Sequence, residues 1–334
     1  GNYQMTQSSD AIVPLGAMRF NSDSSKLEYW NGSAWFQIRT LPPAVTGARA
    51  CVMTGYGPAD VNTIDYFNMA TGGAAVDFGD DTIARRQAGG CSSRIRGICA
   101  AGTPDVDTIS FIEIATAGNA LDFGNLSGSR NGGPAGCSDS TRGLICGGAS
   151  PVQDTIDFIT FASTGNATDF GNLLNSTETF GGSGNSPTRG VIAGGRTPTV
   201  LNVIQFVTIA STGNAVDFGD LVSARRGAGI GPSSNVVRAI FGGGYTPSAT
   251  DSMEFITIPT TGNATDFGDL VKNTTMPAST ASNTKVIFAG GGPSATTTIN
   301  SVQIATIGNA IDFGDLTDDR EQPVGVSNGH GGLG

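Results

Sequence analysis

The sequence is short of charge and of long apolar runs, and each shortage argues against a class of protein. Charged residues make up 14% of the 334 positions and the formal net charge is −10, which argues against a protein that binds nucleic acid or an anionic membrane. No apolar segment is long enough to span a bilayer. The start, GNYQMTQSSD, lacks the basic and apolar regions of a signal peptide, so no such peptide is expected.

Histidine and cysteine are too scarce for the usual metal sites. The one histidine, His330, lies in a glycine-rich tail, where we expect it to be exposed or disordered. The five cysteines include no C-x-x-C spacing, so we expect neither zinc nor another cofactor. Cys91 and Cys99 flank one predicted hairpin, and Cys137 and Cys146 flank the next, so cross-strand disulfides are conceivable. We favour small buried residues, because other repeats carry Gly, Ala, Ile or Phe at similar places.

Glycine is abundant, with 50 residues, and it belongs to an internal repeat. The repeat is marked by the tripeptide Asp-Phe-Gly, at Asp77-Phe78, Asp122-Phe123, Asp169-Phe170, Asp217-Phe218, Asp266-Phe267 and Asp312-Phe313. Its period of 45 to 49 residues suits a propeller blade of four short strands. Six copies without a nucleotide loop argue against the kinase magnesium motif. We expect a structural role, with Phe between blades, Gly in irregular backbone and Asp bonded to local N–H groups.

The fifth unit shows the predicted order of strands most clearly. It reads as an innermost small-residue strand 225–231, an apolar strand 238–241, a third strand 253–258 and an outer strand 264–270. The outer strand follows a Gly-Asn pair, which favours a tight hairpin turn because glycine adopts positive φ. The pair occurs in five units, at Gly118-Asn119, Gly165-Asn166, Gly213-Asn214, Gly262-Asn263 and Gly308-Asn309.

The two ends of the repeat predict a closed ring. The first unit has its second strand at 49–54 but no innermost strand before it, and a spare segment, 320–328, follows the last Asp-Phe-Gly. This segment would fill the vacant place and leave no open edge. We therefore predict an all-β chain: a six-bladed β-propeller over 41–334, closed by a C-terminal strand and preceded by an extended arm and a small β-hairpin appendage over 1–40.

The unit length and the glycine pair that ends the second strand resemble those of the kelch-like propellers, over about residues 41–330. The resemblance implies the fold. The tryptophan common late in kelch units is absent, and the phenylalanines of Asp-Phe-Gly lie near that place. The resemblance therefore implies no kelch partner.

Residues 16–38 predict three short strands with turns at 22–25 and 31–32. They resemble a short element of tailed-phage fibres and other virion structural proteins, through Gly16, Arg19, Phe20, Asn21, Lys26, Leu27, Glu28, Trp30, Asn31, Gly32 and Trp35. The resemblance implies attachment, which Phe20, Trp30 and Trp35 would carry. The alternative is that these aromatic residues fill a small local core.

Two further sets of residues are candidate ligand contacts. A basic residue opens the second strand of every unit and would form a ring able to dock an anion or an acidic glycan, at Arg49, Arg96, Arg142, Arg189, Arg238 and Lys285. We favour the alternative, ion pairs with acidic residues of neighbouring blades. The loops between second and third strands vary most, and Arg196 and Tyr245 are the contacts expected there, with ordinary solvated loops as the alternative.

The expected function is that of a non-enzymatic structural protein of a tailed-phage virion, as a tail or neck fibre, appendage or decoration. Residues 1–40 would bind other virion proteins, and the propeller would face outward, in several copies per particle. The chain would be made in the host cytoplasm and act in the virion. Binding to host-surface glycan is a second role. A free carbohydrate- or protein-binding propeller is the first alternative, and a propeller polysaccharide hydrolase is a weaker one, because no unit carries a distinctive carboxylate pair.

Overall fold

The computed structural model describes residues 13–21, 26–37, 48–178 and 182–334. The chain divides into two compact units, Gly1–Thr46 and Gly47–Gly334. The boundary that we expected between residues 40 and 41 lies outside the described residues. Within the described ranges no helix is long and apolar enough to cross a membrane.

The small unit is a three-stranded antiparallel sheet in the order β1-β2-β3. Its strands are β1 (Met18–Asn21), β2 (Lys26–Trp30) and β3 (Trp35–Gln37). The turn between β2 and β3 is closed by Asn31, whose side-chain oxygen accepts the backbone N–H groups of Ser33 and Ala34 at 2.9 and 2.8 Å. The three strands expected over this segment are therefore present.

The large unit consists of six antiparallel sheets, here numbered I to VI. Sheet I contains β26 (Val324–Ser327), β4 (Arg49–Tyr56), β5 (Asp60–Asn68) and β6 (Val76–Asp80). Sheet II contains β7 (Gly89–Ser92), β8 (Arg96–Ala100), β9 (Thr108–Glu113) and β10 (Leu121–Asn125). Sheet III contains β11 (Ala135–Ser138), β12 (Arg142–Cys146), β13 (Thr155–Thr160) and β14 (Thr168–Asn172).

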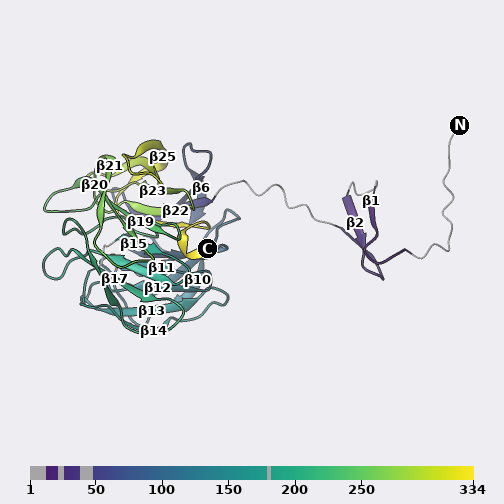
Figure 1. The fold of residues 1–334 in the computed structure, drawn as a ribbon, viewed down its shortest axis with the longest axis horizontal. Helices are drawn as coiled ribbons and strands as arrows, with labels where there is room; N and C mark the ends of the chain where they lie inside the picture. The colour runs from purple at the N-terminus through teal and green to yellow at the C-terminus, as the bar shows by residue number, and fades with distance from the viewer. Residues whose placement is uncertain (1–12, 22–25, 38–47, 179–181) are drawn as a thin grey trace. The chain divides into compact units, whose positions relative to one another are not determined.

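The remaining sheets follow in chain order. Sheet IV contains β15 (Gly182–Asn185), β16 (Arg189–Ala193), β17 (Val203–Thr208) and β18 (Val216–Asp220). Sheet V contains β19 (Arg238–Gly242), β20 (Thr250–Thr257) and β21 (Thr265–Thr274). Sheet VI contains β22 (Ala278–Ala281), β23 (Lys285–Ala289), β24 (Thr296–Gln303) and β25 (Ile311–Arg320), and a short 3-10 turn, η1 (Gly331–Leu333), ends the chain. In Figure 1 the strands β11 to β14 follow one another from the middle of the large unit to its edge.

The hydrophobic core lies between successive sheets. One cluster joins Ile98 and Phe123 of sheet II to Ile145 and Ile159 of sheet III, all nearly inaccessible to solvent. Small residues line the innermost strands, where Gly136 of β11 lies against Gly90 of β7 so closely that a Cβ would be 2.0 Å from a backbone oxygen. Four-stranded antiparallel sheets packed face to face in this way are consistent with a propeller-like fold.

The innermost strand expected over 225–231 of the fifth unit is absent, and sheet V has three strands. The segment and the residues just beyond it make isolated bridges instead. Two are parallel, from Ile230 to Ala278 and from Pro232 to Ser183, and two are antiparallel, from Arg226 to Tyr245 and from Ser234 to Ala239 of β19. Glycine weakens a strand and proline cannot donate to a ladder, which explains why RRGAGIGPSS follows its neighbours without pairing in register.

We expected the Gly-Asn pairs to form two-residue hairpin turns, and this prediction is wrong. In sheet V, seven residues separate β20 from β21, and the turn is closed by the bond from Thr260 N–H to the Thr257 carbonyl at 3.2 Å. Gly262 and Asn263 come later in this connection and contact sheet IV, because Gly262 N–H donates to the Phe218 carbonyl at 2.8 Å. Contact with a neighbouring sheet therefore decides this conformation.

Candidate functional site

The six basic residues that open the second strands join neighbouring sheets. Arg189 lies 4.6 Å over the ring of Phe206 and donates to the backbone carbonyl of Ile258, in the next sheet, at 2.8 Å. The other five basic residues make the same two contacts: the cation lies over an aromatic ring and donates to a backbone carbonyl of another sheet. These residues are Arg49, Arg96, Arg142, Arg238 and Lys285. We favoured ion pairs with acidic residues of neighbouring blades, and this is wrong for the six residues. Of these six, all within the described ranges, only Arg96 forms an ion pair, with Glu113 of its own sheet at 3.2 Å.

The Asp-Phe-Gly segments also hold the sheets together. Phe218 is buried and meets Phe206 edge-on, with ring centroids 5.9 Å apart. Buried phenylalanines at Phe78, Phe123, Phe170 and Phe267 make the same contact with a third-strand aromatic. Phe313 is half-buried and packs on Phe67, since sheet VI has Ser301 at the place of that aromatic. We expected every aspartate of the tripeptide to accept a local N–H group, but of the six, which the structure describes in full, only Asp312 does so, from Gly314 at 3.2 Å.

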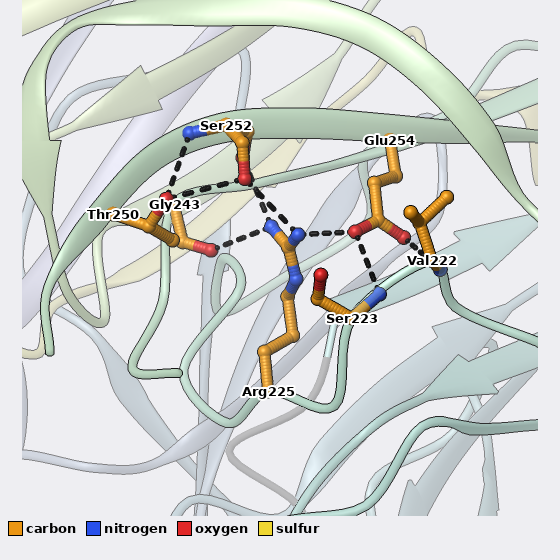
Figure 2. Close-up of polar contacts among 7 residues, drawn as sticks. All are labelled: Val222, Ser223, Arg225, Gly243, Thr250, Ser252 and Glu254. Carbon is orange, nitrogen blue, oxygen red and sulfur yellow. Dashed lines mark hydrogen bonds and ion pairs between the residues drawn. The ribbon is translucent and has the colours of Figure 1, made fainter. Parts of the chain in front are cut away.

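Four arginines that the sequence analysis did not single out are buried and bind the next sheet. Figure 2 shows Arg225, which follows β18. It donates to the carbonyls of Gly243 and Ser252 at 3.0 and 2.9 Å and forms an ion pair with Glu254. Burial lowers the pKa of Arg225, while the Glu254 charge opposes that effect. Glu254 also accepts the backbone N–H of Val222 at 2.7 Å, so its carboxylate is held on both sides.

The other three buried arginines follow the same plan. Arg130 pairs with Asp157 at 2.5 Å and Arg320 with Asp65 at 2.8 Å, both across a sheet boundary. Arg85 pairs at 2.7 Å with Asp81, four residues earlier in the chain. All four arginines lie eight residues after the aspartate of an Asp-Phe-Gly, and this spacing is the signal that could have revealed them. They are structural cations with little access to a ligand.

The expectation of an exposed or disordered His330 is wrong. The side chain is fully buried, and its Nε2 lies 2.9 Å from the Ser92 carbonyl, while its Nδ1 accepts Gly332 N–H at 3.1 Å. The tail is held further by Arg94, which donates to the carbonyls of Leu333 and Gly334 at 2.7 Å. Desolvation by burial lowers the pKa of His330 to about 4. The ring is therefore a neutral part of the packing at pH 7.

The five cysteines are buried and unpaired by disulfides. Cys91 faces Ile98 across the ladder, not Cys99, and Cys137 faces Leu144, not Cys146. Burial raises the pKa of Cys51 and that of Cys99 to about 12. These thiols therefore belong to the packing, and thiolate chemistry is not expected of them.

Six residue pairs recur between neighbouring sheets of the large unit and differ in their side chains. One residue of each pair lies at or just after the end of a second strand, and the other follows the outer strand of the preceding sheet. Two antiparallel backbone hydrogen bonds join them, as between Tyr245 and Arg226 at 2.8 and 3.3 Å. We call these the bridge pairs: Tyr56 with Glu321, Thr103 with Arg86, Ala149 with Asn131, Arg196 with Glu178, Tyr245 with Arg226 and Gly292 with Thr275. The backbone is constant and the side chains vary, as expected of a recognition surface.

Two bridge pairs contribute an exposed tyrosine with a cation on one face: the cation on Tyr245 is Arg226 of the same pair, whereas the cation on Tyr56 is Arg86 of the Thr103 pair. Arg226 lies 5.2 Å from the ring centroid of Tyr245, and Arg86 lies 4.7 Å from that of Tyr56. Both rings are more than one third exposed. Arg196, the other contact expected from sequence, is partly exposed and pairs with Glu178 at 2.7 Å. Such rings and charges suit a ligand with apolar C–H faces, hydroxyl groups and acidic groups.

The described part of the large unit also has a depression of about 480 Å³ between sheets II and III. Ile95, Arg96, Glu113, Thr141 and Phe161 contribute to its wall. The Arg96 guanidinium is already bonded to the Phe161 carbonyl at 2.6 Å and to Glu113. The wall of the depression is therefore mainly apolar, with a few hydroxyl groups.

The small unit does not gather Phe20, Trp30 and Trp35 at one surface. Phe20 is 67% exposed on one face of the sheet, whereas Trp30 and Trp35 are half-buried and lie 5.5 Å apart on the other. No protein-family model and no curated protein sequence matches the chain. Among the described residues, no three His, Cys, Asp or Glu side chains are grouped as metal ligands.

Proposed function

We propose that the large unit is a closed six-bladed β-propeller, with sheets I to VI as its blades. Three contacts support closure: one joins the last strand of the chain to sheet I, and two join sheet VI to sheet I. Strand β26 pairs with β4, Gly73 N–H donates to the Phe313 carbonyl at 3.2 Å, and Arg320 pairs with Asp65. The last two contacts repeat those that join the earlier sheets, as expected if sheet VI is followed by sheet I. The proposed propeller is a rigid carrier for the loops that end in the bridge pairs.

In this proposal the protein is a non-enzymatic structural component of a tailed-phage virion. The N-terminal residues attach it to other virion proteins, and the propeller faces outward. The observation that carries the proposal is the small unit: the residues that resemble the virion element fold as a sheet of their own, and that sheet exposes five large apolar side chains on one face. An exposed apolar surface of this kind marks a contact with another protein.

Labelling of purified phage particles tests the proposal. An antibody against residues 48–334, visualised with gold, should decorate particles that carry the full chain, at a fixed place. Particles assembled with a chain that lacks residues 1–40 should lose the label, whereas a Tyr245→Ala chain, altered only at a bridge pair, should keep it. Unlabelled particles with the full chain would contradict the proposal and leave a free binding propeller as the better one.

The bridge pairs support a second proposed function, binding of host-surface glycan. The observation that favours it is the presence of exposed tyrosines with arginine on one face, which offer stacking and charge together. Soluble protein should bind acidic host polysaccharide, and Tyr245→Ala or Arg196→Ala should weaken binding at least about tenfold. The matched control is Asn131→Ala, in the bridge pair with Ala149, which contains no aromatic and no charged residue. Equal loss in the control, or no binding by the unchanged protein, would contradict this function.

A further inference from the structure

The small sheet has two unlike faces, which the register of its strands defines. Cross-strand partners share a face, and Met18 and Phe36 both lie opposite Tyr29, while Phe20 lies opposite Leu27. One face is therefore wholly apolar. Its members and their exposed fractions are Met18 60%, Phe20 67%, Leu27 41%, Tyr29 40% and Phe36 47%. We call this set the apolar sheet face.

The opposite face is polar, and its groups contact one another. Arg19 and Asn21 donate to the Glu28 carboxylate at 2.9 and 3.0 Å. The Arg19 guanidinium also lies 4.2 Å over Trp35, and Glu28 is 5% exposed. The polar face therefore has a layer of its own, and the exposed apolar surface lies on the side away from the tryptophans.

The size of the apolar sheet face fits a small protein interface. Five side chains of this kind with these exposed fractions leave on the order of 500 Å² accessible. Two such faces in contact would bury about 1,000 Å², the lower limit for a specific interface. A three-stranded sheet of this length is marginal by itself, so a second layer would also supply the core that it lacks.

We propose that the apolar sheet face packs against the same face of a second copy of the chain. The apolar sheet face carries no charged side chain, so the surface that complements it is another uncharged apolar face. A second copy of the chain presents such a face, and the two identical faces can form a self-complementary interface. Two facing sheets form a sandwich in which Phe20, Tyr29 and Phe36 of both copies meet, an arrangement that aromatic rings favour. A net charge of −10 makes two chains repel at long range, which favours contact through a face without acidic groups over contact through an acidic one.

The self-association of the purified full-length chain tests this directly. Sedimentation equilibrium at about 1 to 100 μM, the range expected of a small interface, should show a monomer–dimer equilibrium. Phe20→Ser with Phe36→Ser should raise the dimer dissociation constant at least about 100-fold. The matched control is Val76→Ser with Ile311→Ser, which removes two apolar side chains of similar exposure, 55% and 65%, from outer strands of the large unit.

A second variant tests the geometry without disturbing the fold. Tyr29 is at the centre of the apolar sheet face, and the five native cysteines are all buried, so Tyr29→Cys adds one accessible thiol. On mild oxidation it should give a disulfide-linked dimer, while Val76→Cys, on an outer strand, should not. A monomer at every concentration, a larger fixed oligomer, or equal effects of both variant pairs would overturn the proposal. The test needs no particle, so the two proposals can fail separately. Failure of the dimer would leave the apolar sheet face open for the proposed virion contact, and unlabelled particles with the full chain would leave the dimer standing.

Discussion

Buried charge in the large unit is matched residue by residue. Three buried arginines form ion pairs with acidic residues of the next sheet: Arg130 with Asp157, Arg225 with Glu254 and Arg320 with Asp65. Two units have threonine in place of the arginine, Thr177 and Thr274, and the acidic partner is then the neutral amide Gln205 or Asn300. An unpaired buried charge costs several kcal/mol, so acid and base change together.

The partner of Arg85 tests this reasoning, because its carboxylate stands at a different position from the partners of the other buried arginines. Asp81 stands where the other units have leucine, and Ser110 stands where they have an acid or an amide. Asp81→Leu should destabilise the fold by about 3–5 kcal/mol, because Arg85 loses its carboxylate. Adding Ser110→Asp should restore most of this, since Ser110 already contacts the Arg85 guanidinium. Chemical unfolding measures both, and Asp80→Leu, a change at the exposed last residue of β6, is the control. Simple additivity of the two substitutions would contradict the argument.

His330 should make stability depend on pH. Its pKa is about 4 when folded, against about 6.5 when unfolded, so the unfolded chain binds a proton more readily below pH 6.5. Stability should be complete above that pH and should fall by roughly 3 kcal/mol as the pH drops to about 4. Unfolding by denaturant from pH 7 to pH 4 measures this loss. His330→Gln should remove most of the dependence in that window, and an unchanged slope would show that other groups cause it.

At the scale of the elements, the contact between an Asp-Phe-Gly and the following sheet is the repeated joint. Each glycine of the tripeptide has positive φ, from 138° to 150°, and a Cβ there would lie 2.4 to 2.6 Å from the backbone of the next Gly-Asn or Gly-Ala segment. The asparagine of five such segments accepts a backbone N–H of the preceding outer strand, as Asn166 does from Asn125 at 3.1 Å. The tripeptide is therefore explained by packing.

Gly124→Ala tests that joint. A methyl group would lie 2.4 Å from the Gly165 carbonyl oxygen, at a φ of 144° that side chains rarely adopt. We expect a loss of about 2 kcal/mol or more in the free energy of unfolding. Gly128→Ala, in the same unit but with open space around it, should change stability by less than about 0.5 kcal/mol. Equal effects would show that the close approach is unimportant.

The repeat made most strands predictable, because its period and apolar runs are local properties of the sequence. Segment 238–241 and the three N-terminal strands lie where we expected them. The buried ion pairs were missed, since Arg225 and Glu254 are 29 residues apart and only the packing of neighbouring sheets brings them together. The Gly-Asn turn and the position of His330 were wrong for the same reason: contacts with distant residues outweigh local preference.

At the scale of the whole molecule, we propose that the small sheet contacts other proteins and that the large unit presents variable loops. The large unit can hold its loops rigidly only if its sheets form one ring. Closure depends on β26, whose residues Val324 and Val326 are fully buried against the first sheet's β4. The central claim is therefore that the last strand of the chain completes the first sheet.

A single substitution measures this most directly. Val326 lies opposite Cys51 in the ladder, so Val326→Cys places two thiols at the spacing of a cross-strand pair, about 4.5–5.5 Å between Cα atoms, which a disulfide accepts. We predict that oxidation links the introduced thiol to Cys51 and stabilises the protein by roughly 4–5 kcal/mol over its reduced form, as peptide mapping and unfolding would show. Val324→Cys, opposite Met53, should form no such link. A free thiol at position 326, or a bond to another cysteine, would contradict closure.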